Sequence, residues 1–193
     1  MAIVGVVPAA GKGARFAAEL PGGPHKLLTP VGDEPMVRRT VTSLLAGGAA
    51  RCVVVVSSDV ESPVRAALAD LPVSVVVNPD PSRGMFSSIQ CGVAETTERD
   101  TCVLLPGDMP YVQPDTVAAV IAAAAEAGLT ACASHEGRRG HPIACSAALR
   151  ARILQAPAGA ILSEERSRDE FLSIDVSDPG VHRDVDRPGD LLP

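Results

Sequence analysis

Short apolar runs alternate with amphipathic segments along most of this chain. The runs at 2–7, 52–56, 73–77, 101–105 and 129–134 are rich in β-branched residues, which is typical of buried strands in a parallel sheet. Apolar residues recur at helical spacing at 36–46, 60–71, 85–98 and 114–128. This alternation predicts an α/β fold: a doubly wound, mainly parallel, Rossmann-like sheet with right-handed crossovers in a three-layer α/β/α arrangement.

The remaining segments are expected to extend the same domain. We expect a short strand off the main sheet at 141–144, helices at 147–154 and 161–171, and an extended segment at 172–176. With 46% apolar residues in 193 positions, the chain can bury one large core, and it shows no internal repeat and no linker. We therefore predict a single domain over residues 1–193.

The composition argues against several classes of function. A net charge of −6 with scattered basic residues argues against a nucleic-acid partner, and 2% aromatic residues provide no stacking platform for bases. No apolar run is long enough to span a bilayer and no charged region precedes the first strand, so we expect no membrane partner. Five dispersed cysteines without a C-x-x-C pair favour reduced thiols. These features predict a cytoplasmic protein that acts on a small ligand.

The passage at 8–15, Pro-Ala-Ala-Gly-Lys-Gly-Ala-Arg, should lie at the carboxyl end of the first strand, where open α/β sheets bind ligands. Gly11 and Gly13 lack a Cβ, so their backbone N–H groups can approach phosphate oxygens. Arg15 and Lys26 add positive charge for the same anion. The passage matches neither the dinucleotide fingerprint, which needs a third glycine, nor the P-loop, and we expect no helix to open there. On these residues alone, a phosphate site and a structural turn both remain open.

Carboxylates follow the strand at 101–105 and recur near the end of the chain. Asp108, in Pro-Gly-Asp-Met-Pro, should project from the same sheet edge as the glycine loop. An acid beside a phosphate cradle needs a cation between them, and Mg²⁺ held by one or two carboxylates and substrate phosphates meets that need. Asp184 and Asp186 would share one face if their segment is extended. The alternatives are an Asx-turn at Asp108 and a solvated acidic tail.

A further group of polar residues surrounds His141. This histidine follows a glycine turn in Arg-Gly-His-Pro and could orient a substrate or donate to a phosphate. Arg138 and Arg139 could bind an anionic second substrate. Ser87 and Ser88 could contact a ligand at a helix N-terminus or act as ordinary caps. The structural alternatives are a histidine bonded to a turn carbonyl and solvated turn arginines.

Together these segments resemble the nucleotidyltransferases of molybdenum cofactor maturation over almost the whole chain. The glycine loop with Lys26 resembles the family signature Leu-Ala-Ala-Gly-x-Ser-x-Arg-x-Gly-x-x-Lys. Further matches, in the family's order, are Asn78-Pro79 with Gly84-Met85-Phe86-Ser87-Ser88-Ile89-Gln90-Cys91-Gly92, then Pro106-Gly107-Asp108-Met109-Pro110, Gly137-Arg138-Arg139-Gly140-His141-Pro142-Ile143, and Asp184-Val185-Asp186-Arg187-Pro188-Gly189-Asp190-Leu191. The chain departs from the pattern at Phe16 and at 156–161, which lacks the acid and arginine common in the cytidylyltransferases.

The resemblance implies a role for each matching residue. The residues that would hold the nucleoside triphosphate are Ala9, Ala10, Gly11, Gly13, Arg15, Lys26, Asn78, Gly84, Ser88 and Asp108. Arg15, Lys26 and Asp108 would be catalytic, Asp108 and Asp186 would hold Mg²⁺, and Arg139 and His141 would bind the acceptor. In the family, Ala-Ala-Gly in the first loop accompanies cytidine and Ala-Gly-Gly accompanies guanosine, so the loop here implies CTP.

The implied reaction is Mg²⁺-dependent transfer of CMP from CTP to a phosphorylated acceptor, molybdopterin, with release of pyrophosphate. A molybdoenzyme or a cofactor-handling protein would be a partner. The alternatives are guanylyl transfer to the same cofactor and cytidylyl transfer to a sugar or polyol phosphate such as methylerythritol phosphate, whose enzymes have a similar Val-Pro-Ala-Ala-Gly opening. An alternative of another class is a non-catalytic nucleotide-binding protein.

Overall fold

A computed structural model describes residues 2–168 and 170–192, so residues 1, 169 and 193 of the predicted domain lie outside the described residues. The strands are β1 Ile3–Pro8, β2 Pro30–Val31, β3 Glu34–Pro35, β4 Arg51–Val56, β5 Val73–Val77, β6 Thr101–Leu104, β7 Thr130–His135, β8 Arg138–Ala144 and β9 Phe171–Asp175. The α-helices are α1 Ala14–Glu19, α2 Met36–Ala46, α3 Glu61–Ala67, α4 Met85–Ala94, α5 Pro114–Ala127, α6 Ala147–Gln155 and α7 Leu162–Arg166. Short 3₁₀ helices are η1 Lys26–Leu28, η2 Pro81–Arg83, η3 Pro179–His182 and η4 Pro188–Asp190.

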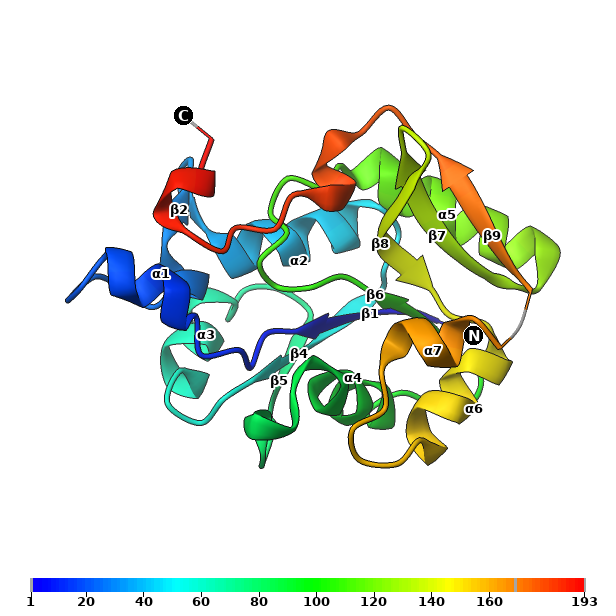
Figure 1. The fold of residues 1–193 in the computed structure, drawn as a ribbon, viewed down its shortest axis with the longest axis horizontal. Coiled ribbons are helices and arrows are strands. Elements are labelled where there is room, and N and C mark those ends of the chain that lie inside the picture. Colours follow the sequence, from blue (N-terminus) through cyan, green and yellow to red (C-terminus); the bar gives the residue numbers. More distant parts are fainter. Residues whose placement is uncertain (1, 169, 193) are drawn as a thin grey trace.

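Seven of the described strands form one sheet in the order β5-β4-β1-β6-β8-β7-β9. Only β8 among them runs antiparallel to its neighbours. The predicted α/β fold with a mainly parallel sheet is therefore confirmed (Figure 1). In the register of the sheet, Val6 of β1 lies between Val53 of β4 and Leu104 of β6. The carboxyl ends of these three strands consequently meet at one edge.

The expected strand at 141–144 is the main error in the predicted topology. The observed β8 begins at Arg138 and lies inside the main sheet, between β6 and β7. A short turn at Glu136-Gly137 joins β7 to β8, and strands joined by so short a turn run antiparallel. This insertion brings His141 beside the residues that follow β6.

Helices cover both faces of the sheet, and α4, α6 and α7 lie below it in Figure 1. Alternate residues of β1 serve the two faces: Val7 packs in one core with Leu44 of α2 and Val117 of α5, whereas Val6 packs in another with Ile89 of α4. A strand buried on both faces needs apolar residues at every position, which explains why the opening run is continuously apolar.

The helices differ from expectation at two places. A helix does open after the glycine loop, since α1 begins at Ala14. The helix expected at 161–171 ends at Arg166, and Phe171 instead begins β9, which pairs in parallel with β7. Residue 169 of that expected helix lies outside the described residues. None of the described helices combines the length and apolar character needed to cross a membrane.

Candidate active site

The glycine loop leaves β1 at the carboxyl edge of the sheet, where the sequence predicts it. The N–H of Ala9 donates to the carbonyl of Val55 on β4 at 2.7 Å. The next four N–H groups, from Ala10 to Gly13, have no hydrogen-bond acceptor among the described residues. Gly13 has a φ of 56°, a left-handed conformation that glycine adopts without steric cost, and α1 begins directly after it. Successive free N–H groups at such an edge form a concavity suited to an anion.

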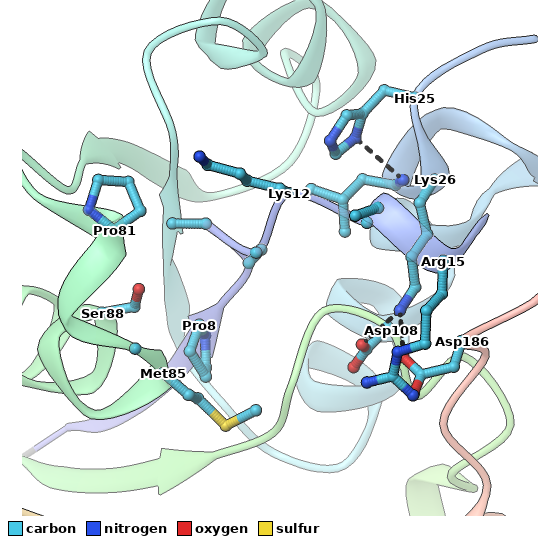
Figure 2. Close-up of a pocket in the computed structure, with 17 residues that line it drawn as sticks. Pro8, Lys12, Arg15, His25, Lys26, Pro81, Met85, Ser88, Asp108 and Asp186 are labelled. Carbon is cyan, nitrogen blue, oxygen red and sulfur yellow. Dashed lines mark hydrogen bonds and ion pairs between the residues drawn. The ribbon is translucent and has the colours of Figure 1, made fainter. Parts of the chain in front are cut away.

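Lys26 is the centre of an ionic cluster beside this loop. Its side chain is only 9% exposed, and its Nζ lies 2.7 Å from Asp108 Oδ2 and 3.1 Å from Asp186 Oδ1. The guanidinium of Arg15 lies 2.5 Å from Asp186 Oδ2. Figure 2 shows these four side chains converging at one end of the pocket, whereas Lys12 extends away from them. We call Arg15, Lys26, Asp108 and Asp186 the Lys26 cluster.

Backbone hydrogen bonds bring the two carboxylates together. Asp108 lies in the turn after β6, and its neighbour Gly107 donates its N–H to the last residue of β1 at 3.1 Å. The carbonyl of Asp108 accepts the N–H of Val185 at 2.9 Å, which holds the C-terminal segment against this turn. Asp190 accepts the N–H of Asp186 at 2.9 Å and so fixes the following turn. The C-terminal motif thus delivers a carboxylate to a site built mainly from the first half of the chain.

A cavity of about 360 Å³ lies between the glycine loop and the start of α4. The predicted nucleotide-binding residues that line it are Ala9, Ala10, Gly11, Gly13, Arg15, Lys26, Gly84, Ser88 and Asp108. Asn78 does not line it: this side chain is buried and its Nδ2 donates to Ser87 Oγ at 2.8 Å and Ser88 Oγ at 3.0 Å. Asn78 therefore lies outside the cavity and holds the hydroxyl group of Ser88, which lines it. The ligand contacts of all these residues remain predictions.

Several lining residues were not selected from the sequence, among them Lys12, His25 and Met85. The Nδ1 atom of His25 accepts the N–H of Leu27 at 3.3 Å, and burial lowers the pKa of His25. Its position directly before Lys26 is the one sequence signal that could have identified it. Met85 lines the cavity and is 58% exposed. It was not selected from the sequence because methionine is more often a core residue than a contact residue.

A second cavity, of about 530 Å³, adjoins the first, and the two share Arg15, Met85, Asp108 and Asp186. Arg139 and His141, the predicted acceptor residues, both line this second cavity, whereas Arg138 lines neither. Burial, with smaller contributions from Arg166 and His182, lowers the pKa of His141 to about 4. His141 is therefore neutral at neutral pH.

The two carboxylates suit a hard cation such as Mg²⁺. Asp108 and Asp186 already approach one cation, the ammonium of Lys26, and their side chains are 26% and 30% exposed. Within residues 2–168 and 170–192, no group of three or more His, Cys, Asp and Glu side chains is arranged to hold a metal. Because Mg²⁺ is ordinarily bound by one or two carboxylates together with substrate phosphates and water, this donor set fits a metal that binds with a nucleotide.

The sheet topology, the glycine loop and the carboxylates at one edge define an α/β protein of the nucleotidyltransferase type. Residues 5–172 match the model of the MobA-like NTP transferase domain, and the chain belongs to that family. It is accordingly a member of a nucleotidyltransferase family. The family membership by itself leaves the nucleotide and the acceptor open.

Two characterised proteins illustrate the range of relatives. The chain is 38% identical over 122 residues to the bifunctional protein GlmU of Alkalilimnicola ehrlichii, which covers 62% of this chain and 24% of that protein. It spans about a quarter of the length of this protein and of two further GlmU proteins. It is also 29% identical to nicotine blue oxidoreductase of Paenarthrobacter nicotinovorans, over 95% of this chain and 92% of that one.

Solved structures show the same architecture. A nucleotidyl transferase from Methanothermobacter thermautotroptrophicus (Mth528) superposes with a TM-score of 0.80 at 26% identity, covering 98% of this chain and 94% of the other. The manganese complex of Rv0371c from Mycobacterium tuberculosis superposes with a TM-score of 0.75 at 24% identity, covering 98% and 96%. The second likeness shows the fold alone.

Proposed function

We propose that this protein transfers CMP from CTP to a phosphorylated acceptor, molybdopterin, and releases pyrophosphate. The observation that carries the proposal is the Lys26 cluster, in which one ammonium reaches both Asp108 and Asp186 at the end of the glycine-loop cavity. Residues from the N-terminal part, the middle and the C-terminal part of the chain meet there, and all of them were selected from the sequence as residues that handle phosphate or metal.

The reaction needs positioning and charge neutralisation more than acid–base chemistry. The acceptor phosphate is anionic at neutral pH, so its oxygen can attack the α-phosphorus of the nucleotide while the bond to the leaving pyrophosphate breaks. Negative charge then spreads over the α-phosphate and the pyrophosphate. We expect the free N–H groups from Ala10 to Gly13, together with Lys26 and Arg15, all at this cavity, to neutralise it.

Asp108 and Asp186 would hold Mg²⁺, which when bound supplies further neutralisation of the triphosphate. The manganese complex of the similarly folded Rv0371c supports a divalent cation in this role. Cytidine as the base rests on the sequence resemblance of Ala9-Ala10-Gly11. Ala9 and Ala10 both line the cavity. The second cavity, with Arg139 and His141, supports an acceptor bound beside the nucleotide.

Pyrophosphate release by the purified protein tests this proposal. CTP, GTP, ATP and UTP are supplied in turn with Mg²⁺, with molybdopterin or methylerythritol phosphate as acceptor. We expect release from CTP that depends on molybdopterin. Release from GTP would indicate the guanylyl alternative, and release that depends on methylerythritol phosphate would indicate the polyol phosphate alternative. Binding of a triphosphate without release under any condition would favour the non-catalytic protein.

The full-length similarity to nicotine blue oxidoreductase favours a second candidate, an oxidoreductase. Many oxidoreductases use a nicotinamide dinucleotide, which the glycine-loop cavity would then hold. Thermal melting with CTP and Mg²⁺, with NADH and with NADPH separates the two candidates, because a ligand that binds the folded state raises the melting temperature. Stabilisation by CTP alone supports the transferase. Stabilisation by a dinucleotide alone supports the oxidoreductase.

A further inference from the structure

Two arginines from different elements stack on the same aromatic ring. The guanidinium carbon of Arg139, in β8, lies 4.5 Å from the centre of the Phe171 ring, and that of Arg166, at the end of α7, lies 5.0 Å from it. Phe171 is the first residue of β9, and Figure 1 shows α7, β8 and β9 in the same half of the molecule. The two charges are thus less than about 10 Å apart and repel each other unless an anion binds near both.

Neither guanidinium is neutralised by a carboxylate in the part of the chain that the structure describes. Arg139 and Arg166 form no ion pair there, and the Nε atom of Arg166 is buried without a hydrogen-bond acceptor. Glu165, the residue before Arg166, is already paired with Arg168 at 3.1 Å. The two arginines therefore retain the capacity to bind an external anion.

Both arginines line the second cavity, whose other lining groups indicate what kind of molecule fits. Met85, Ile143 and Leu162 provide apolar surface. The carboxylates of the Lys26 cluster are already paired, and Asp184 is the only further carboxylate among the lining residues. His141 is neutral. The cavity thus combines an apolar wall with a cationic end.

We propose that Arg139 and Arg166, positioned by Phe171, bind the phosphate group of an acceptor whose apolar body lies against Leu162. A phosphate monoester carries a charge of about −1.5 to −2 and several acceptor oxygens, so it can pair with two guanidinium groups at once, whereas a carboxylate would leave one unneutralised. Phe171 is a positioning residue that holds both guanidinium groups through cation–π contacts. The identification of this ligand as the acceptor rests on the proposed function. The phosphate site itself does not, since it requires no nucleotide.

Phenyl phosphate is a suitable probe, because it has an apolar ring and a phosphate monoester, and phenol is its uncharged counterpart. Calorimetric titration without nucleotide is expected to show binding of phenyl phosphate and none of phenol. Arg139→Gln and Arg166→Gln should each weaken binding at least about tenfold. The matched control is Arg138→Gln, one residue along β8 and outside the cavity, which should bind like the wild type.

Phe171 is tested by a pair of variants. Phe171→Leu removes the ring and should weaken binding several-fold, whereas Phe171→Tyr keeps the ring face and should restore it. Circular dichroism and the melting temperature show whether each variant is folded, and the tyrosine variant keeps the test valid if the leucine variant is not. Equal binding by folded Phe171→Leu and wild type would overturn the role of the ring.

Three results would overturn the phosphate site: no binding of phenyl phosphate to the wild type, binding unchanged by Arg139→Gln and Arg166→Gln, or binding lost in Lys26→Met but not in these variants. The last result would place the probe in the nucleotide cavity. The proposed transferase fails separately. A protein that binds phenyl phosphate through both arginines but releases no pyrophosphate retains this site and lacks the proposed activity.

Discussion

Replacing Gly11 by alanine should separate ligand binding from folding at the glycine loop. A Cβ built on Gly11 meets no atom within 4 Å and its φ is not positive, so the folded chain can accommodate the methyl group. Such a substitution leaves stability unchanged or raises it by about 0.4–1 kcal/mol, because it restricts the unfolded chain. The same methyl group would keep a phosphate away from the free N–H groups. Losing one charge-assisted hydrogen bond, about 1.5–3 kcal/mol, corresponds to roughly 10- to 150-fold weaker nucleotide binding.

Gly13→Ala is the matched comparison two residues further along. Its φ of 56° is left-handed, and a Cβ there would lie 3.2 Å from the Cβ of Lys26. Alanine in this conformation costs about 1–2 kcal/mol. In a chain of this length each kcal/mol lowers the melting temperature by about 2–4 °C. We therefore expect Gly13→Ala to lower the melting temperature by about 2–8 °C, in contrast to Gly11→Ala.

Thermal melting without ligand and calorimetric titration with CTP and Mg²⁺ measure the two effects separately. The reasoning is refuted if Gly11→Ala binds CTP within about twofold of the wild type, since the open space beside Gly11 would then not be the phosphate position. It also fails if Gly11→Ala and Gly13→Ala lower the melting temperature equally, because glycine at 11 would then be needed by the fold.

Four further predictions concern the site and the core. Asp108→Asn should slow pyrophosphate release by at least about 100-fold at saturating Mg²⁺, because it removes the charge of one of the two carboxylates that would hold the metal. A near-normal rate at every Mg²⁺ concentration would contradict the role of Asp108 as a metal ligand. Burial lowers the pKa of His141 from 6.5 to about 4, so between pH 6.5 and pH 4 the unfolded chain binds more protons than the folded chain and stability is lost as the pH falls. His141→Gln should therefore make the melting temperature less dependent on pH in this range. An unchanged dependence would argue against burial of a neutral ring. Burial raises the pKa of Cys52 to about 12, so this thiol is rarely in the reactive thiolate form. Iodoacetamide should therefore modify the partly exposed Cys91 before Cys52 in the native protein, which mass spectrometry can measure. Early labelling of Cys52 would be inconsistent with the packed core. Ala10→Gly should increase the use of GTP relative to CTP, because Ala-Gly-Gly accompanies guanosine in the family that the loop resembles. An unchanged ratio of initial rates would show that this position, which lines the cavity, does not select the base.

Local sequence patterns were sufficient to predict most helices and strands, because the apolar spacing and the chain-breaking residues that mark an element lie within a few residues of one another. The run at 73–77 is β5 without any change of bounds, and α5 begins at Pro114 and is followed by Gly128 in a left-handed conformation. The order of the motifs that resemble the nucleotidyltransferase family was likewise sufficient to select all four residues of the Lys26 cluster as candidate site residues. Local signals misled where another segment decided the outcome, as at 141–144, where pairing with β6 and β7 placed a strand inside the sheet.

The sequence by itself determined the alternation of strands and helices, and hence the α/β class, because apolar periodicity and chain-breaking residues act over short distances. It also supplied the glycines, the lysine and the carboxylates that a phosphate site needs. Only the tertiary structure decided which of these groups share one cation, since 160 positions separate Lys26 from Asp186. It alone also placed Arg139 and Arg166 on one ring, because those contacts depend on how β8, β9 and α7 pack rather than on any spacing along the chain.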